Sequence, residues 1–200
     1  MAKTLDMHTQ QVEILARIVR AEEKVQARLV RVSGLLAQAQ IPYAVIGGHA
    51  VAAWVATIDE SLVRATRDVD VLVKPEDLER IREVLEEDGF IYGHVAEMDI
   101  FLEDRDGKVG AAVHLIFSGR KVRPDYVLPA PDVDDSGIGG NFSVIPLESL
   151  VQTKLVAWRR KDQVHLLDLL GTGLIDPLWP QRFQEPLRSH RPELIDNPES

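Results

Sequence analysis

Hydrophobic residues recur at three- and four-residue steps over residues 7–39, and this spacing predicts an amphipathic helix. The apolar stripe consists of Val12, Leu15, Ile18, Val19, Val25, Leu29, Val32, Leu35 and Leu36. No proline interrupts the stripe, so it allows either one long helix or two helices that divide near Ala21 and Glu22. Gly34 weakens the helix locally, and Pro42 follows its end.

Short apolar runs then alternate with helix-like stretches. Residues 43–46 are all apolar or aromatic, which is typical of a buried strand, and the alanine-rich residues 49–56 predict a helix. Residues 68–73 alternate valines with Asp68, Asp70 and Leu72, which predicts a second strand. A helix is predicted over residues 75–88, with Pro75 in its first turn.

The second half of the chain begins with a predicted hairpin, in which residues 98–102 and 109–117 flank a turn at Asp106 and Gly107. The remaining predicted elements are a loop over 118–140, a short strand over 141–145 and helices over 147–158 and 163–170. This order predicts an α/β or α+β fold with a mixed sheet core. We expect a single domain over 1–200, divided into a helical segment 1–40, a core 41–145 and a helical segment 146–200.

Composition narrows the class of protein. The chain is 45% hydrophobic and 28% charged, as in globular proteins rather than disordered ones. It lacks an apolar run of membrane length and an apolar signal segment, so we expect a cytoplasmic protein with no membrane partner. The absence of cysteine excludes disulfides and thiolate metal sites. A net charge of −9 argues against nonspecific nucleic-acid binding but permits a local basic patch or an enzyme that holds Mg²⁺.

The chemistry that the pattern suggests centres on Asp68 and Asp70. Side chains two residues apart in a strand point to the same side, so the two carboxylates are close enough to share a cation. Two like charges on an apolar strand are costly unless a positive charge neutralises them, and a divalent metal with oxygen ligands would do so. The alternative is an exposed edge strand that carries two solvated acids.

Three further features each allow a functional and a structural interpretation. Gly47 and Gly48 lie between a strand and a helix, where free backbone N–H groups bind anions, although a plain tight turn has the same pattern. Arg64 and Arg67 could contact phosphates or simply balance the acids. His114, between two hydrophobic residues, is either a site residue or a buried histidine with its hydrogen bonds satisfied.

Taken together, these motifs resemble the DNA polymerase β-type nucleotidyltransferase superfamily. The resemblance rests on residues 41–46, the Gly47–Gly48 turn, the alanine-rich helix and residues 66–73, which hold Asp68 and Asp70. Within the superfamily the chain is most similar to the bacterial AbiEii-type toxins and related small nucleotidyltransferase-fold proteins. The resemblance implies a nucleotidyltransferase-type mixed sheet and Mg²⁺-dependent transfer of an NMP from an NTP to an RNA or protein acceptor. It also implies the toxin role of a toxin–antitoxin pair, with an antitoxin as partner.

The resemblance further assigns roles to individual residues. Asp68 and Asp70 would bind two Mg²⁺ ions that align a hydroxyl with the α-phosphate and stabilise the leaving pyrophosphate. The implied nucleotide-binding residues are Gly47, Gly48, Arg67, Lys154, Lys161 and Asp162. For the last three, the alternative is a solvated helix end with local ion pairs.

His114 departs from the superfamily pattern, because it stands where a third carboxylate is usual. The replacement removes one negative charge and one oxygen ligand, and Mg²⁺ prefers hard oxygen ligands. A neutral His114 could still act in catalysis by accepting the proton of the attacking hydroxyl, and Asp99 on the neighbouring strand could replace the missing ligand. A second hypothesis follows, namely a nucleotidyltransferase-fold protein without catalysis that acts as a nucleotide-binding or interaction module.

Overall fold

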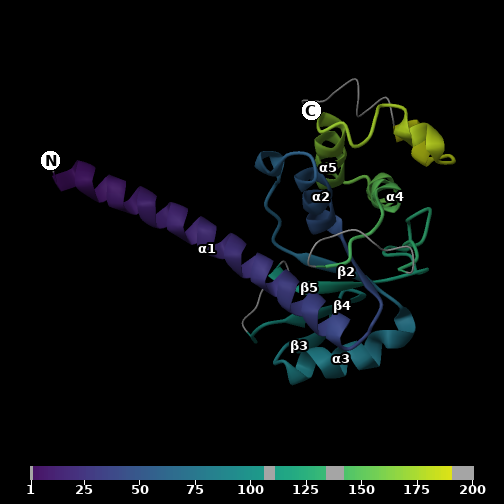
Figure 1. Cartoon of the computed structure of the whole chain (residues 1–200), viewed down its shortest axis with the longest axis horizontal. Coiled ribbons are helices and arrows are strands. Elements are labelled where there is room, and N and C mark those ends of the chain that lie inside the picture. Colours follow the sequence, from purple (N-terminus) through teal and green to yellow (C-terminus); the bar gives the residue numbers. More distant parts are fainter. Residues whose placement is uncertain (1, 106–110, 134–141, 191–200) are drawn as a thin grey trace.

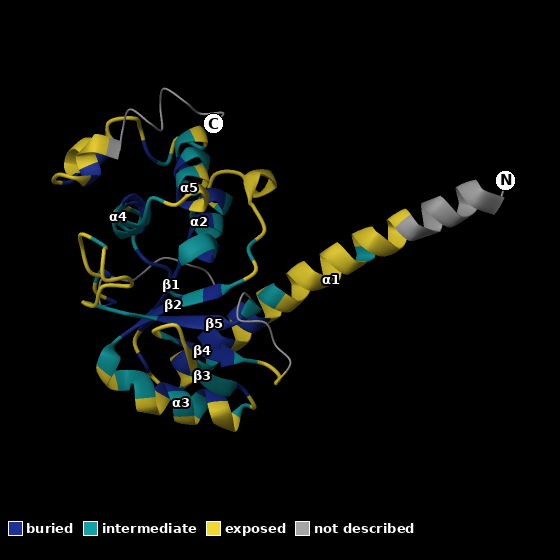
Figure 2. Cartoon of the chain, turned by 180° about the vertical axis from the view of Figure 1, so that it is seen from behind, coloured by how far each residue is buried: buried dark blue, intermediate teal, exposed yellow. Residues whose placement is uncertain are grey.

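The computed structural model describes residues 2–105, 111–133 and 142–190 of the chain. Its first element, α1 (Ala2–Gln38), is one continuous helix, so the run does not divide near Ala21. The C-terminal part of α1 lies against the rest of the protein, whereas the N-terminal half projects away from it, as the views from both sides show (Figures 1 and 2).

The apolar stripe of α1 is therefore divided between two environments. Near the C-terminal end, Leu29, Val32 and Leu36 are buried in the core. Farther toward the N-terminus the exposed members, each more than half exposed, are Val12, Leu15, Ile18 and Val19. The periodicity predicted one apolar face along the whole helix. Among the described residues, contacts with the rest of the protein cover only the C-terminal half of that face.

The centre of the fold is a five-stranded mixed sheet. Its strands are β1 (Tyr43–Ile46), β2 (Val69–Val73), β3 (Ile91–Val95), β4 (Met98–Leu102) and β5 (Val113–Phe117). They lie in the order β1-β2-β5-β4-β3, and only the β2–β5 pair is parallel. The antiparallel pairing of β4 with β5 confirms the predicted hairpin, while the turn at Asp106 and Gly107 lies outside the described residues.

Two parts of the sheet differ from the prediction. The sequence did not reveal β3, a half-exposed edge strand with Gly93 at its centre, which pairs with β4. The turn between them uses Ala96 and Glu97 with φ of 49° and 64°, so it lacks the usual Asn-Gly signal. The strand predicted over 141–145 is wrong in its described part, where Val144 forms only an isolated parallel bridge to Val45.

The helices form a layer on each face of the sheet (Figure 1). Besides α1 they are α2 (Gly47–Ala56), α3 (Leu78–Glu87), α4 (Leu147–Ala157) and α5 (Arg160–Gly171). Short 3-10 turns lie at Glu60–Leu62, Pro75–Asp77, Trp179–Arg182 and Leu187–His190. One core lies between the sheet and α2, α4 and α5, and a second lies between the sheet and α1 and α3. The mixed α/β fold class is confirmed. No helix among the described residues is both long and apolar enough to cross a membrane.

The alternation of β2 decides which layer receives its polar side chains. Val69, Val71 and Val73 belong to the core of α1 and α3, and Leu72 belongs to the core of α2, α4 and α5. Because side chains alternate along a strand, Asp70 points to the same face as Leu72. The aspartate thus faces the layer that contains the glycine turn and the C-terminal helices.

Candidate functional site

Asp68 and Asp70 lie at the start of a central strand and meet His114 from the neighbouring strand. In the β2–β5 register Asp70 is directly opposite His114, and His114 Nδ1 lies 3.0 Å from Asp70 Oδ1. One ligand atom from each of Asp68, Asp70 and His114 lies within 4.8 Å of the other two. The alternative of an exposed edge strand with two solvated acids is therefore wrong. Two carboxylates and an imidazole at this spacing are a donor set that fits a divalent cation.

The glycine turn lies against the same aspartate. Ile46 at the end of β1 is paired with Asp70, and α2 begins at the next residue, Gly47. A Cβ atom on Gly47 would lie 2.1 Å from Asp70 Oδ2, and its φ is +74°, so only glycine fits here. No side chain caps the N-terminus of α2, so the first turn of this helix, which begins at Gly47 beside Asp70, has uncapped backbone N–H groups.

Positive charge comes from the junction between α4 and α5. Asp162 is fully buried and accepts hydrogen bonds from Lys154 Nζ at 3.3 Å and from Arg159 Nε at 2.7 Å. Its Oδ2 also accepts the Arg159 backbone N–H at 3.2 Å. Lys161, one residue earlier, lies 3.8 Å from Asp68 through its Nζ atom. Asp162 thus holds Lys154 and Arg159 in position, and its own oxygens are engaged.

The environment keeps both carboxylates of this region ionised. Burial raises the pKa of Asp70, but the hydrogen bond and electrostatic interaction with His114, together with the positive charges of Lys154 and Lys161, outweigh burial and leave that pKa below its usual value. Burial also raises the pKa of Asp162, and Arg159 and Lys154 again bring it below the usual range. For Lys154 itself, burial lowers the pKa against the opposing charges of Asp162 and Asp70.

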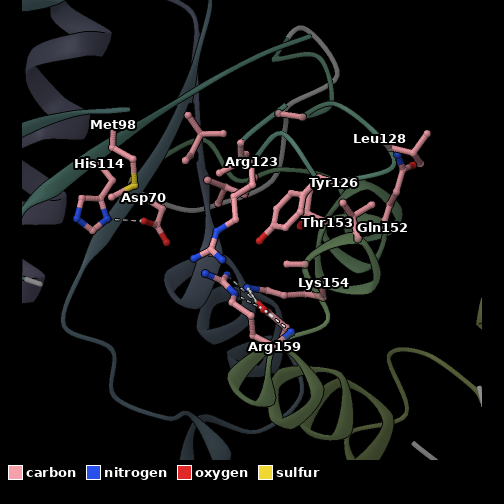
Figure 3. A pocket seen from close by; sticks show the side chains of 18 of the residues that line it. Asp70, Met98, His114, Arg123, Tyr126, Leu128, Gln152, Thr153, Lys154 and Arg159 are labelled. Carbon is pink, nitrogen blue, oxygen red and sulfur yellow. Dashed lines mark hydrogen bonds and ion pairs between the residues drawn. The ribbon is translucent and has the colours of Figure 1, made fainter. Parts of the chain in front are cut away.

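These groups surround one cavity of about 400 Å³. Asp68, Asp70 and His114 line one end of it, together with Gly47 and Met98. The charged and polar residues farther along the wall are Arg123, Tyr126, Gln152, Thr153, Lys154, Arg159, Lys161 and Asp162. Figure 3 shows the side chains of Arg123, Lys154 and Arg159 directed inward between the Asp70–His114 end and the end with Tyr126 and Gln152.

Most of the predicted site residues thus line the cavity, but not all of them do. Gly48 lies behind Gly47, where an added Cβ atom would meet Thr66 Oγ1 at 2.7 Å. Arg67 is exposed and is not among the cavity-lining residues. Arg64 Nε contacts the Asp168 carboxylate on α5 at 2.8 and 2.9 Å, so its ion-pair partner is neither Asp68 nor Asp70.

Asp99 does not replace the missing third carboxylate, and this expectation is wrong. In the β4–β5 register Asp99 is opposite Leu115, whereas His114 is opposite Ile100. Since successive residues face opposite sides, Asp99 points to the α1–α3 face. There its carboxylate accepts a hydrogen bond from the Tyr92 hydroxyl and lies 3.1 Å from His94 Nδ1.

The sequence reasoning missed several lining residues. Arg123 and Tyr126 come from the proline-rich loop after β5, where no periodic pattern indicates which side chains point inward. Gln152 and Thr153 lie on α4, where polar side chains carry no signal of their own. The basic run 159–161 was a signal in the sequence, but the resemblance left open whether Arg159 or Arg160 belongs to the site.

Comparison with known proteins places this geometry in a family. The sequence model of a family described as uncharacterised nucleotidyltransferase matches residues 7–133. The chain belongs to this nucleotidyltransferase family. The resemblance seen in the sequence is confirmed at the level of the superfamily. No curated protein matches the chain.

Solved structures of other nucleotidyltransferases share the fold. An antigenic nucleotidyltransferase-like protein from Paracoccidioides brasiliensis has a TM-score of 0.58 and 16% identity, covering 88% of this chain and 89% of its own. The solution structure of the antibiotic-resistance factor ANT(2'')-Ia has a TM-score of 0.55 and 13% identity, and the match covers 87% of this chain and 97% of that protein's chain. The crystal structure of ANT(2'')-Ia in complex with adenylyl-2''-tobramycin has a TM-score of 0.50 and 13% identity, and the match covers 86% of this chain and 98% of that protein's chain.

Proposed function

We propose that this nucleotidyltransferase-family protein transfers an NMP from an NTP to a hydroxyl of an RNA or protein acceptor with the help of a divalent cation. One observation carries the proposal. A single cavity has the carboxylates of Asp68 and Asp70 at one end and an inward-facing set of cations along its wall, among them Lys154, Arg159 and Arg123. That combination suits a triphosphate whose α-phosphate lies beside a metal.

The residues along the cavity divide the work of binding. Lys154, Arg159 and Arg123 bind the phosphates, because each places a positive charge on the cavity wall, and Arg side chains match phosphate geometry. The first turn of α2, which begins at Gly47, adds uncapped backbone N–H groups. Tyr126 supplies a ring on which a nucleobase can stack, at the end of the cavity away from Asp70.

Asp68 and Asp70 would hold the cation, which would supply Lewis-acid polarisation of the α-phosphate. The acceptor oxygen bonds to the α-phosphorus as the bond to pyrophosphate breaks, and the hydroxyl proton leaves to a basic group at this end of the cavity. Lys161 and Asp162 act indirectly. Lys161 neutralises Asp68 before nucleotide binds, and Asp162 positions Lys154 and Arg159.

The acceptor and the biological role follow the AbiEii-type resemblance. Lys161, with a side chain 53% exposed, and the exposed Arg123 lie at the cavity and would attract a polyanionic acceptor such as RNA. We propose that the protein acts as the toxin of a toxin–antitoxin pair, so its expression should slow growth. The antitoxin is then its protein partner.

Labelling tests the transfer reaction. Purified protein incubated with a divalent cation and each α-labelled NTP should transfer label to cellular RNA or to a protein pool. Asp70→Asn removes a negative charge at the end of the cavity where the cation would bind, so it should abolish labelling and any growth defect. Asp168→Asn is the matched control, because Asp168 is a carboxylate on α5 that pairs with Arg64 outside the cavity lining.

The second candidate, a nucleotide-binding module without catalysis, is favoured by His114 in the place of a third carboxylate. Calorimetry separates the two. NTP binding that is indifferent to divalent cations, together with no labelling of any pool, would sink the transferase proposal and support the binding module. Growth that is equal for the native protein and Asp70→Asn would remove the toxin role.

A further inference from the structure

The third member of the cluster with Asp68 and Asp70 is the imidazole of His114, which comes from a strand of the sheet. His114 lies in the middle of the five-strand order on β5, with β2 on one side and β4 on the other. It is 8% exposed, and its Nδ1 atom approaches Asp70 Oδ1 at 3.0 Å. Because the strand register pairs Asp70 with His114, the imidazole stays on the face of Asp70 as long as that register is kept.

Donor chemistry indicates which cation this cluster prefers. Mg²⁺ binds through oxygen in a strict octahedral arrangement, whereas imidazole suits first-row transition metals. Mn²⁺ accepts carboxylate and phosphate oxygens as Mg²⁺ does. Because it is a larger and softer first-row transition ion, it also binds a ring nitrogen more readily than Mg²⁺ does. A set of two carboxylates and one imidazole therefore favours Mn²⁺ over Mg²⁺.

The charges around the cluster suit one ion rather than two. Asp68 and Asp70 supply two negative charges, and His114 supplies none when neutral. Lys161 Nζ already lies 3.8 Å from Asp68, and the charge of Lys154 acts on Asp70. Within the described ranges no further acidic or histidine ligand joins this group. Two carboxylate charges balance a single divalent cation.

We propose that Asp68, Asp70 and His114 bind one Mn²⁺ ion in preference to Mg²⁺, with a His114 ring nitrogen as a direct ligand. The inference rests on the proposed function, which gives the reason for a cation at this place, and it replaces the two Mg²⁺ ions expected from the family resemblance. His114 is then a metal ligand and not the acceptor of the hydroxyl proton.

Electron paramagnetic resonance of the full chain tests the proposal without any assay of activity. After treatment with a chelator, the protein is titrated with MnCl₂, and Mg²⁺ is then added as competitor. We expect one Mn²⁺ per chain, bound about tenfold or more tightly than Mg²⁺. Spin-echo modulation should show coupling to the nitrogen of one directly bound imidazole.

Two variants make the test specific. His114→Asp supplies the third carboxylate, so it should remove the nitrogen coupling and lower the Mn²⁺ to Mg²⁺ preference by about tenfold or more. His94→Gln is the matched control, because His94 is an exposed histidine on β3 that contacts Asp99 on the opposite face. It should leave both measurements unchanged.

Equal affinities for Mn²⁺ and Mg²⁺, two bound Mn²⁺ ions, or an echo without nitrogen coupling would overturn the proposal, and so would coupling that persists in His114→Asp. If that variant does not fold, the measurements on the native chain still decide. Nitrogen-ligated Mn²⁺ without transfer of any NTP would support this metal assignment while contradicting the proposed function. Transfer that runs equally well with Mg²⁺ and shows no nitrogen coupling would do the reverse.

Discussion

At the scale of single residues, Gly47 shows how one missing methyl group builds the site. Its φ of +74° lets the chain turn from β1 directly into α2, and its hydrogen leaves room for the Asp70 carboxylate. Any other side chain meets both a strained backbone and an oxygen atom. The close approach of helix and aspartate therefore depends on this residue type.

Gly47→Ala should destabilise the protein and displace Asp70. We expect a loss of about 1–3 kcal/mol in the free energy of unfolding, from backbone strain and the contact with Asp70. Gly34→Ala in α1 is the control, because an added Cβ there meets no atom within 4 Å, and it should stabilise by up to about 1 kcal/mol. Urea denaturation of both variants measures the difference, and a loss of equal size in both would contradict this account.

His165 on α5 is a partly buried titratable group next to the site. Its Nδ1 atom has no hydrogen-bond partner among the described residues. Burial, together with the positive charges of Lys154, Lys161 and Arg64, lowers its pKa to about 4 against the opposing effect of Asp162. Histidine is therefore neutral here across the range in which it titrates in the unfolded chain.

This depressed pKa links stability to pH. Between pH 6.5 and about 4 the unfolded chain takes up a proton at His165 that the folded protein does not, so stability falls as pH falls through this window. We expect a contribution of about 2 kcal/mol after allowance for partial exposure. His165→Gln should flatten the slope of unfolding free energy against pH in this window, measured by urea denaturation at several pH values. An unchanged slope in the variant would show that His165 is not responsible.

At the scale of elements, the two halves of the apolar stripe on α1 contribute differently to the stability of the fold. Leu29 is 1% exposed within the core, whereas Leu15, two heptads earlier on the same stripe, is 62% exposed. Hydrophobic stabilisation scales with the apolar area removed from water. The C-terminal half of the helix therefore contributes to folding, and the projecting half contributes little by itself.

Leu29→Ala should cost about 2–5 kcal/mol because it leaves a cavity in the core. Leu15→Ala, the same substitution on the same helix, should change the stability by no more than about 0.5 kcal/mol. Thermal or chemical unfolding of the two variants makes the comparison. A large loss at Leu15 would mean that another surface covers the projecting half of α1 in solution.

At the scale of the whole molecule, the sheet separates two cores that share the same strands. The tryptophans, Trp54, Trp158 and Trp179, all belong to the layer of α2, α4 and α5. Leu85 on α3 lies in the other core. Fluorescence therefore reports on one layer only, while circular dichroism reports on the helices of both.

If residues 1–200 form the predicted single domain, a change in either core must destabilise both. Leu85→Ala and Leu169→Ala, one in each core, should each lower stability by about 2–5 kcal/mol. In both variants the fluorescence and circular dichroism transitions should coincide. A Leu85→Ala protein whose dichroism transition moves while its fluorescence transition stays would indicate two independently folding layers.

The sequence by itself determined what depends on near neighbours along the chain. The helices and the strands other than β3 follow from residues a few places apart, and so does the shared face of Asp68 and Asp70, because backbone geometry repeats every 3.6 or 2 residues. The tight turn at Gly47 was indicated in the same way. The mixed α/β class and the nucleotidyltransferase superfamily were within reach of these local signals.

Only the tertiary structure decided what depends on pairing between distant segments. The β2–β5 register places His114 beside Asp70, and the β4–β5 register sends Asp99 to the opposite face. The loop after β5 contributes Arg123 to the cavity. A shift of one residue in strand register moves every side chain of that strand to the opposite face of the sheet. Side chains in loops follow no period at all. Periodicity therefore placed the aspartates on a strand, and the packing of distant strands and helices made them one end of a charged cavity.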